Sequence, residues 1–335
     1  MTNRQRVIDA VNFKKTDYVP YSVGFTGQAW DKTVALMGED YLKSVNDHIS
    51  SVDLGKPQVE TEPGHFKDEF GVVWNKTGAD KDIGYPDFWL IPDRESFERN
   101  VFPDVDEQYV RDCMEALGKM PDTQFRGASI GFSLFERLWT MMGMENALSN
   151  MLLDPELVHD ALNAICERNL KVIGIALEYD FDYFYFGDDW GQQNGLIMGI
   201  THWREFIRPY LKKMYSAVRE SGRYIGQHSC GDIRLLLDDL HELGLNIYQT
   251  FQPEIYGLDY AEKLRGKIAV WGAISTQRDL PDKTPGEIRE ITKKTLAAFR
   301  EHGGLIAAPT HAIPGDVPVE NIVAMLDAAY ENSFY

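Results

Sequence analysis

The order of apolar and polar positions predicts alternating strands and helices over the second half of the chain. Short apolar runs rich in β-branched and aromatic residues are each followed by a stretch with the 3.6-residue period of an amphipathic helix. The predicted strands span 126–132, 182–186, 246–251, 268–272 and 305–308, with one more ending at His228. The predicted helices span 134–152, 155–179, 233–243, 285–302 and 318–330. Such alternation is typical of a parallel sheet.

The first third of the chain follows a different pattern. It predicts helices at 3–13, 29–37, 40–49, 94–100 and 106–119, a strand from Asp17 to Val23, a hairpin at 66–76 and an ordered cover at 85–92. No linker, repeat or low-complexity segment interrupts the sequence, so residues 1–335 are expected to form one domain. The length suits one barrel of ~250 residues with insertions. We therefore predict a (β/α)8 TIM barrel with an N-terminal helical and hairpin elaboration.

Composition narrows the functional classes. With 44% hydrophobic residues, the chain can bury a large core, and its net charge of −18 excludes a nucleic-acid or anionic-membrane surface, because both require basic patches. No apolar run approaches the ~20 residues of a membrane span, and no signal segment follows the N-terminus. The three cysteines do not form a disulfide framework. These features predict a cytoplasmic protein.

The segment from Gln227 to Asp232 places the most potential metal-binding side chains close together in the sequence. His228 and Cys230 stand two residues apart at a strand end, where an imidazole and a thiol can share one metal ion, most simply zinc. Asp232 is a suitable cap for the helix that follows, and the start of that helix would favour a thiolate at Cys230. The alternative for this pair is a buried cysteine beside a hydrogen-bonded histidine.

Polar residues also stand at the ends of other predicted strands. Asp188, Asp189, Glu254 and His311 occupy such positions, and in a (β/α)8 barrel these ends open onto the face that carries the active site. A cysteine, two histidines and an acid form an open or closable zinc shell. Each residue has an alternative: Asp188 or, more readily, Asp189 could cap a helix, while Glu254 and His311 could be ordinary loop residues.

Seven short motifs in this order resemble the uroporphyrinogen decarboxylase superfamily over essentially the full length of the chain. They are Asp17-Tyr18-Val19-Pro20, Asp68-Glu69-Phe70-Gly71, Gly187-Asp188-Asp189-Trp190-Gly191, His228-Ser229-Cys230-Gly231-Asp232, Gln252-Pro253-Glu254, Trp271-Gly272-Ala273-Ile274 and Ala308-Pro309-Thr310-His311. The resemblance implies a distorted (β/α)8 barrel. The His-x-Cys sequence is similar to the branch of cobalamin-dependent methyltransferases, which implies zinc at His228 and Cys230.

The same resemblance implies the remaining ligands. The third zinc position of that branch, a cysteine there, falls at His311, and Glu254 matches a carboxylate that closes the shell when substrate is absent. The decarboxylase itself is a poorer match, because its N-terminal arginine motif is missing: no arginine occurs between Arg6 and Arg94. A substrate with eight carboxylates would also meet a strongly acidic chain.

Replacing a thiolate by an imidazole leaves zinc one charge unit more positive and a better Lewis acid. We therefore expect a zinc methyltransferase that moves a methyl group from a small O- or N-methylated donor, such as a methoxylated aromatic, to the corrinoid of a partner protein. Asp188 would bind substrate or orient a ligand, and Trp190, Phe132 and Phe135 would wall an apolar pocket. The alternatives are a metal-free carboxy-lyase, a methylcobamide:thiol methyltransferase, and a non-catalytic corrinoid-binding or scaffold barrel with structural zinc. The sequence leaves the oligomeric state open.

Overall fold

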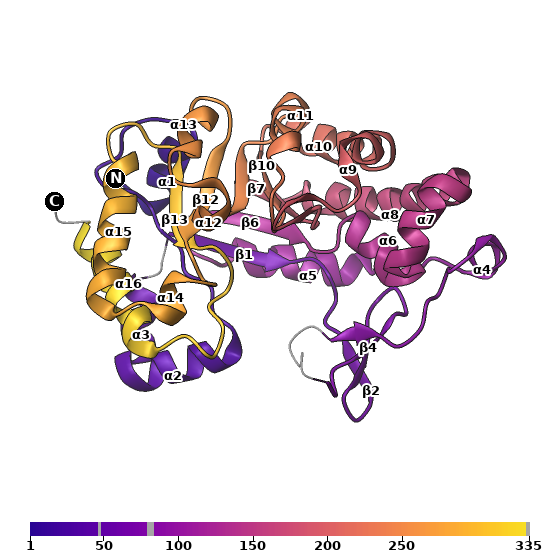
Figure 1. The fold of residues 1–335 in the computed structure, drawn as a ribbon, viewed down its shortest axis with the longest axis horizontal. Helices are drawn as coiled ribbons and strands as arrows, with labels where there is room; N and C mark the ends of the chain where they lie inside the picture. Colours follow the sequence, from indigo (N-terminus) through magenta and orange to yellow (C-terminus); the bar gives the residue numbers. More distant parts are fainter. Residues whose placement is uncertain (46–47, 79–83, 333–335) are drawn as a thin grey trace.

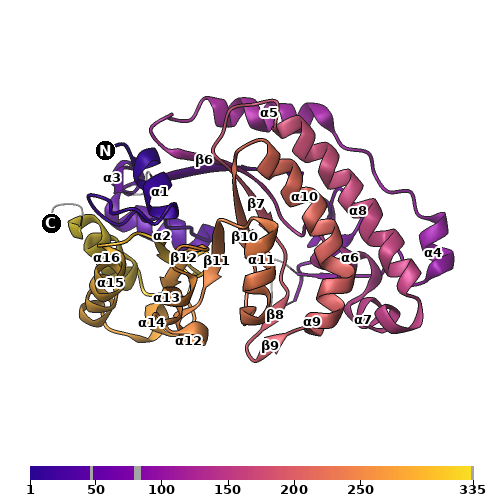
Figure 2. The ribbon, with the colours of Figure 1, turned by 90° about the horizontal axis from the view of Figure 1, so that it is seen from above.

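A curled parallel sheet forms the centre of the computed structural model, which describes residues 1–45, 48–78 and 84–332. Helices cover its convex side (Figures 1 and 2). The sheet has seven strands in the order β1-β6-β7-β10-β11-β12-β13. They span Ile49–Asp53 (β1), Phe125–Ile130 (β6), Tyr183–Gly187 (β7), Tyr224–His228 (β10), Ile247–Phe251 (β11), Ala269–Ile274 (β12) and Leu305–Pro309 (β13). The predicted α/β architecture with a parallel sheet is confirmed.

Closure into an eight-stranded barrel is not confirmed. The predicted strand from Asp17 to Val23 is an extended segment joined to the β13 side of the sheet by two isolated bridges, Tyr21 to Ala307 and Phe25 to Ile313. No ladder within the described residues connects this segment to β1. Pro20 lacks an N–H donor, which weakens any ladder at this position.

The outer helices follow the strands as expected. The longer ones are α5 (Glu107–Gly118), α8 (Pro155–Ala176), α10 (Arg208–Glu220), α15 (Pro285–Phe299) and α16 (Val319–Glu331). Local sequence explains their starts: Asp154 caps α8 with Pro155 behind it, and Thr284 forms a capping box with Glu287 on α15. Within the described residues, no helix combines the length and apolar character needed to cross a bilayer.

The N-terminal end of the sheet is closed by α1 (Asn3–Val11). Val7 and Val11 of this helix pack in one cluster with inward residues of the strands, which are Phe125, Tyr183, Ile247, Ala269 and Ile306. The carboxyl ends of the strands lie at the opposite end. This arrangement makes the strand ends the accessible face, as in barrel enzymes.

The predicted hairpin at 66–76 is confirmed as part of a four-stranded antiparallel sheet, seen at the lower right of Figure 1. Its strands are β2 (Val59–Glu62), β3 (His65–Lys67), β4 (Val73–Asn75) and β5 (Tyr85–Pro86). Asp68 forms the turn between β3 and β4 by accepting hydrogen bonds from the backbone N–H groups of Phe70 and Val72. Residues 79–83 lie outside the described part of the chain.

Three predicted helices differ from the structure. The helix at 40–49 ends at Val45 as α3, residues 46–47 lie outside the described part of the chain, and Ile49 already begins β1. The helix at 134–152 is divided at Gly143, whose φ of 91° ends α6 (Phe135–Met142) before α7 (Met144–Leu153) begins. The helix at 233–243 begins as a 3-10 turn at Arg234–Leu236 and becomes α11 only at Leu237–Leu243. Shorter helices complete the chain: α2 (Gly27–Met37), α3 (Glu39–Val45), α4 (Arg94–Arg99), α9 (Gly199–His202) with a π-helical turn at Trp203–Ile207, α12 (Pro253–Tyr256), α13 (Tyr260–Leu264) and α14 (Asp279–Asp282).

Candidate metal centre

Three potential metal ligands meet at the carboxyl ends of β10 and β13. His228 is the last residue of β10, Cys230 follows two residues later, and His311 lies two residues beyond β13. Their ligand atoms all lie within 4.8 Å of one another, and His228 Nε2 is 3.5 Å from Cys230 Sγ. The fold thus brings together the three residues that the sequence indicated as a zinc shell. This donor set, with two imidazoles and one thiol, suits zinc.

The orientation of His228 favours metal binding. Its Nδ1 donates a hydrogen bond to Oε1 of Gln249 on β11, and Tyr185 donates to the same oxygen at 2.7 Å. The Gln249 amide nitrogen in turn donates to the carbonyl of Thr310, the neighbour of His311. With its proton on Nδ1, the imidazole presents the lone pair of Nε2 toward Cys230.

The Cys230 loop is held by its neighbours on both sides. Asp189 accepts a 2.7 Å hydrogen bond from the Cys230 backbone N–H, and Gln252 accepts one from Gly231. Gly231 has a φ of 77°, and a Cβ atom there would lie 2.4 Å from the backbone of Gly191. Only glycine allows this close contact between the two loops.

The state of the thiol differs from the sequence-based expectation. Burial, and then the negative charge of Asp189, raise the pKa of Cys230 to about 12. The following helix gives little help, because its regular α-helical part begins only at Leu237. In the absence of a cation the thiol is therefore protonated at neutral pH, and a bound metal ion would be needed to form the thiolate.

His311 is suited to act as a neutral ligand. Desolvation of the ring, and then the charge of the nearby His228, lower the pKa of the His311 imidazole. The ring centroids of the two histidines are 5.7 Å apart. A neutral imidazole at neutral pH keeps one nitrogen lone pair free for coordination.

Asp188 has structural partners. Its buried carboxylate accepts hydrogen bonds from the backbone N–H groups of Leu134, Phe135 and Glu136 and from the indole N–H of Trp190. Burial raises the pKa of Asp188 above its usual range, while these four donors favour the ionised form. The Asp188 side chain thus caps α6 from the loop after β7, while its backbone N–H donates a 3.2 Å hydrogen bond to the carbonyl of His228.

Asp189 and Glu136 are two further acids of the site, of which the sequence indicated Asp189 at a strand end but not Glu136. Asp189, expected to cap a helix, instead places Oδ1 3.4 Å from His228 Nε2. Glu136 accepts a hydrogen bond from the Asp189 backbone N–H, and burial, followed by the charges of Asp189 and Asp188, raises its pKa well above the usual value. The position of Glu136 results from tertiary contacts between α6 and the β7 loop, which no local motif indicates.

Glu254 lies on α12, and its carboxylate does not belong to the group of ligand atoms formed by the triad. Both of its oxygens are buried without a hydrogen-bond partner among the described residues. Glu254 and burial together raise the pKa of Asp279, burial having the larger effect. The role of Glu254 as an exchangeable fourth ligand therefore stays a prediction.

The three predicted aromatic wall residues lie in two environments. Phe135 and Trp190 are fully buried core residues, and the Trp190 ring packs at 5.4 Å from that of Trp203. Phe132 is partly exposed and lines a cavity of about 590 Å³ at the rim of the sheet. A second cavity, of about 360 Å³, lies inside the curled sheet and is lined by His311, Gln249, Tyr185 and Trp271 among others. This second cavity offers space for a small molecule beside the triad.

The family described as uroporphyrinogen decarboxylase (URO-D) matches residues 92–332, which is most of the chain. The chain belongs to the uroporphyrinogen decarboxylase family. Within this family, the matched region contains the triad, Asp189 and Arg137, whereas the antiparallel sheet of β2–β5 lies ahead of it. A search of curated proteins found no match.

Solved structures support the fold. A methyltransferase from Methanosarcina mazei aligns with a TM-score of 0.67 and 15% identity, covering 99% of both chains. A D-psicose 3-epimerase from Clostridium cellulolyticum aligns with a TM-score of 0.40 and 10% identity over 68% of this chain and 82% of that chain. The first comparison shows that this member of the uroporphyrinogen decarboxylase family shares its complete fold with a methyltransferase of low sequence identity. The TM-score of the second alignment is too low to support any inference.

Proposed function

We propose that this protein is a zinc-dependent methyltransferase that transfers a methyl group from a small O- or N-methylated donor to the corrinoid of a partner protein. The observation that supports the proposal most is the convergence of His228, Cys230 and His311 within 4.8 Å at the strand ends. The fold-level likeness to a methyltransferase is consistent with it. The absence of any arginine between Arg6 and Arg94, where the decarboxylase motif would lie, argues against decarboxylation of a polycarboxylate substrate.

The residues of the chain would prepare the site in defined ways. His228, Cys230 and His311 would hold zinc, which when bound supplies a Lewis acid for the oxygen or nitrogen of the donor. Gln249 fixes the tautomer of His228, and Asp189 fixes the backbone of Cys230. One thiolate with two imidazoles keeps more positive charge on the metal than two thiolates with one imidazole would.

Metal analysis of the purified protein tests the first part of this proposal. We expect near-stoichiometric zinc in the wild-type protein and a loss of most of it in Cys230→Ser and His311→Ala, because each variant removes one of three ligands. Thr250, whose hydroxyl lies 3.8 Å from the Cys230 sulfur, offers a control in Thr250→Val, which should retain the metal. Equal zinc in all four proteins would contradict the assignment.

An activity assay tests the second part. A panel of O- and N-methylated donors is incubated with cob(I)alamin, and formation of methylcobalamin is followed. Transfer from at least one donor, lost in Cys230→Ser, is the expected result. Methylation of a thiol by methylcobalamin, without transfer from any donor, would reverse the direction of the proposed reaction.

A further inference from the structure

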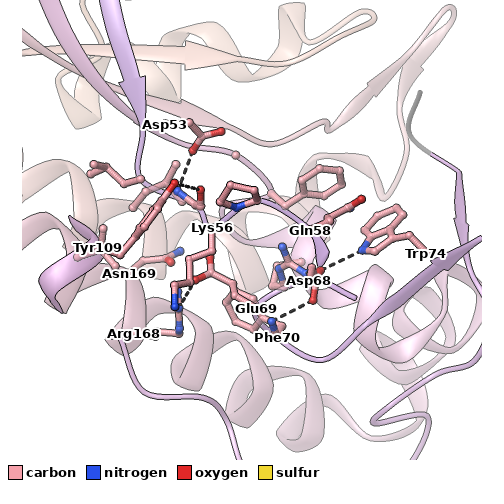
Figure 3. A pocket seen from close by; sticks show the side chains of 18 of the residues that line it. Asp53, Lys56, Gln58, Asp68, Glu69, Phe70, Trp74, Tyr109, Arg168 and Asn169 are labelled. Carbon is pink, nitrogen blue, oxygen red and sulfur yellow. Dashed lines mark hydrogen bonds and ion pairs between the residues drawn. The ribbon is translucent and has the colours of Figure 1, made fainter. Parts of the chain in front are cut away.

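The rim cavity of about 590 Å³ is lined by charged and aromatic side chains that do not belong to the metal centre. It lies over the ends of β1 and β6, and Figure 3 shows acidic, basic and aromatic side chains around it. Its walls come from the segment after β1, the β3–β4 turn, α5, α6 and α8. Four cations and three carboxylates line it, which are Lys56, Lys76, Arg137 and Arg168, with Asp53, Asp68 and Glu69. In a chain of net charge −18, this is a locally basic cavity.

Arg137 is the group in this cavity with the most unused hydrogen-bonding capacity. Its side chain is 92% buried, yet the guanidinium makes a single hydrogen bond, from Nη1 to Asp68 at 2.6 Å. Its Nε is buried and has no partner among the described residues. A guanidinium carries five N–H donors, and a buried donor without a partner destabilises the protein.

Asp68 cannot satisfy the rest of this guanidinium. Its carboxylate already accepts hydrogen bonds from the backbone of Phe70 and Val72 and from the indole of Trp74. Asp68 thus holds the β3–β4 turn and positions Arg137 at the same time. Arg168, by comparison, has both Glu69 and the Pro103 carbonyl as partners.

Aromatic rings surround the guanidinium. Its central carbon lies 4.1 Å from the ring centroid of Phe70 and 5.6 Å from that of Phe132. Phe132 has a φ of 49°, in the left-handed region that bulky residues rarely adopt, and its ring also packs against Trp74 at 5.6 Å. Strained backbone of this kind is concentrated at ligand-binding sites.

We propose that this cavity binds the methyl donor as an aromatic carboxylate, with Arg137 holding the carboxylate and Phe132, Phe70 and Trp74 contacting the ring. The proposal rests on the proposed function and narrows its donor class. A planar guanidinium stacked on aromatic rings matches a carboxylate through two parallel hydrogen bonds. A neutral donor would leave the buried charge of Arg137 with Asp68 as its only described anionic partner.

The cavity lies on the same side of the sheet as the metal centre, two strands away from His228. Gly131 and Phe132 line the cavity, and a Cβ atom built on Gly187 would lie 3.3 Å from the Gly131 Cα. Gly187 pairs directly with His228 in the sheet. On β1, Asp53 lines the rim cavity and Ser51 the inner cavity beside His311. Because alternate strand residues share a face, the two cavities follow one side of the sheet.

Equilibrium binding tests the proposal without corrinoid or turnover. Isothermal titration calorimetry of the wild-type protein with 4-methoxybenzoate should show binding, and the uncharged 4-methoxybenzamide should bind at least about 10-fold more weakly. In Arg137→Met the affinity for the carboxylate should fall about 10- to 100-fold, to the level of the amide. Arg137→Lys should recover part of the loss, since it keeps the charge but not the planar fork.

Lys56→Met is the matched control. Lys56 lines the same cavity but is more exposed and pairs with Asp106 at 2.5 Å, so removing its charge should change the affinity less than about threefold. Equal affinity for the two probes, no binding of 4-methoxybenzoate, or an unchanged affinity in folded Arg137→Met would overturn the proposal. Should Arg137→Met fail to fold, the comparison of the two probes on wild-type protein decides.

Failure of this inference can be told apart from failure of the proposed function. Zinc retention and methyl transfer from uncharged donors, without carboxylate preference, would leave the methyltransferase proposal intact and exclude the carboxylate site. Tight and Arg137-dependent binding of 4-methoxybenzoate to a protein that never retains zinc would support the carboxylate site and contradict the zinc-dependent methyltransferase.

Discussion

The two halves of the accessible rim are built by different interactions. Around the triad, neighbouring strand ends of one sheet are joined by amide and backbone hydrogen bonds, with Gln249 at the centre. Around the rim cavity, segments far apart in sequence are joined by ion pairs, Asp68 with Arg137 and Glu69 with Arg168. The first region is part of the sheet itself. The second depends on a small antiparallel sheet, whose buried Phe70, Val72 and Trp74 pack against the main core.

This difference indicates a division of roles. A metal ion needs ligands held within a few tenths of an ångström, and hydrogen bonds between adjacent strands provide such rigidity. A cavity that admits a substrate needs a wall that can yield, and ion pairs between separate segments allow local opening at low free energy. Perturbations of the triad side should therefore affect metal binding or global stability, whereas those of the cavity side should remain local.

The largest effect is expected at Asp188. Asp188→Ala would leave three backbone N–H groups at the start of α6 and the Trp190 indole without an acceptor, in a fully buried position. At about 1 kcal/mol or more for each donor, the free energy of unfolding should fall by about 3–5 kcal/mol. Urea denaturation measures this. The neighbouring variant Asp189→Ala should lower the free energy of unfolding by about 1 kcal/mol or less, since the Asp189 side chain is partly exposed. Equal losses of stability in the two variants would refute the structural role assigned to Asp188.

The next effect concerns metal affinity. Gln249→Met removes the acceptor for His228 Nδ1, so the affinity for zinc should fall about 10- to 100-fold. Competition with a chelator of known affinity gives the measurement. Gln227→Met is the matched control, because Gln227 precedes His228 and bonds Tyr215 and the His228 backbone carbonyl, but not the imidazole. Zinc affinity that falls equally in both variants would show that Gln249 acts only through stability.

The sheet was predictable where its strands are apolar. The runs that became β6, β7 and β11–β13 are buried and β-branched or aromatic, and their positions agree with the prediction within one or two residues. Strand β1 escaped prediction because Ile49–Asp53 reads Ile-Ser-Ser-Val-Asp, and Ser51 faces a cavity instead of the core. The opposite error occurred at 17–23, where apolar residues pack on the sheet without forming a strand.

The candidate site was predictable only in part. The spacing of His228 and Cys230 is a local pattern, and the position of His311 follows from the topology of parallel strands. Gln249 and Glu136 take their places through contacts between separate strands and loops, which no spacing indicates. The sequence Asp68-Glu69-Phe70-Gly71 was evident as a motif, but its partners Arg137 and Arg168 lie on α6 and α8.

The smallest effect should appear at Asp68, where a substitution tests whether the rim-cavity region opens independently of the triad region. In Asp68→Asn the amide oxygen can still accept the Phe70 and Val72 hydrogen bonds, but the ion pair with Arg137 and the acceptor for the Trp74 indole are lost. We expect the β3–β4 turn to open more easily, by about 1–2 kcal/mol in the hydrogen-exchange protection of residues 66–74.

Zinc content of Asp68→Asn should equal that of the wild-type protein, because no ligand of the triad contacts this turn in the described structure. Asp104→Asn, at a fully exposed carboxylate that pairs with Lys171 at 3.9 Å, should leave exchange at 66–74 unchanged. If Asp68→Asn instead lowered zinc content or accelerated exchange throughout the sheet, the two regions would be one cooperative unit. The rim cavity could then not open independently of the metal centre.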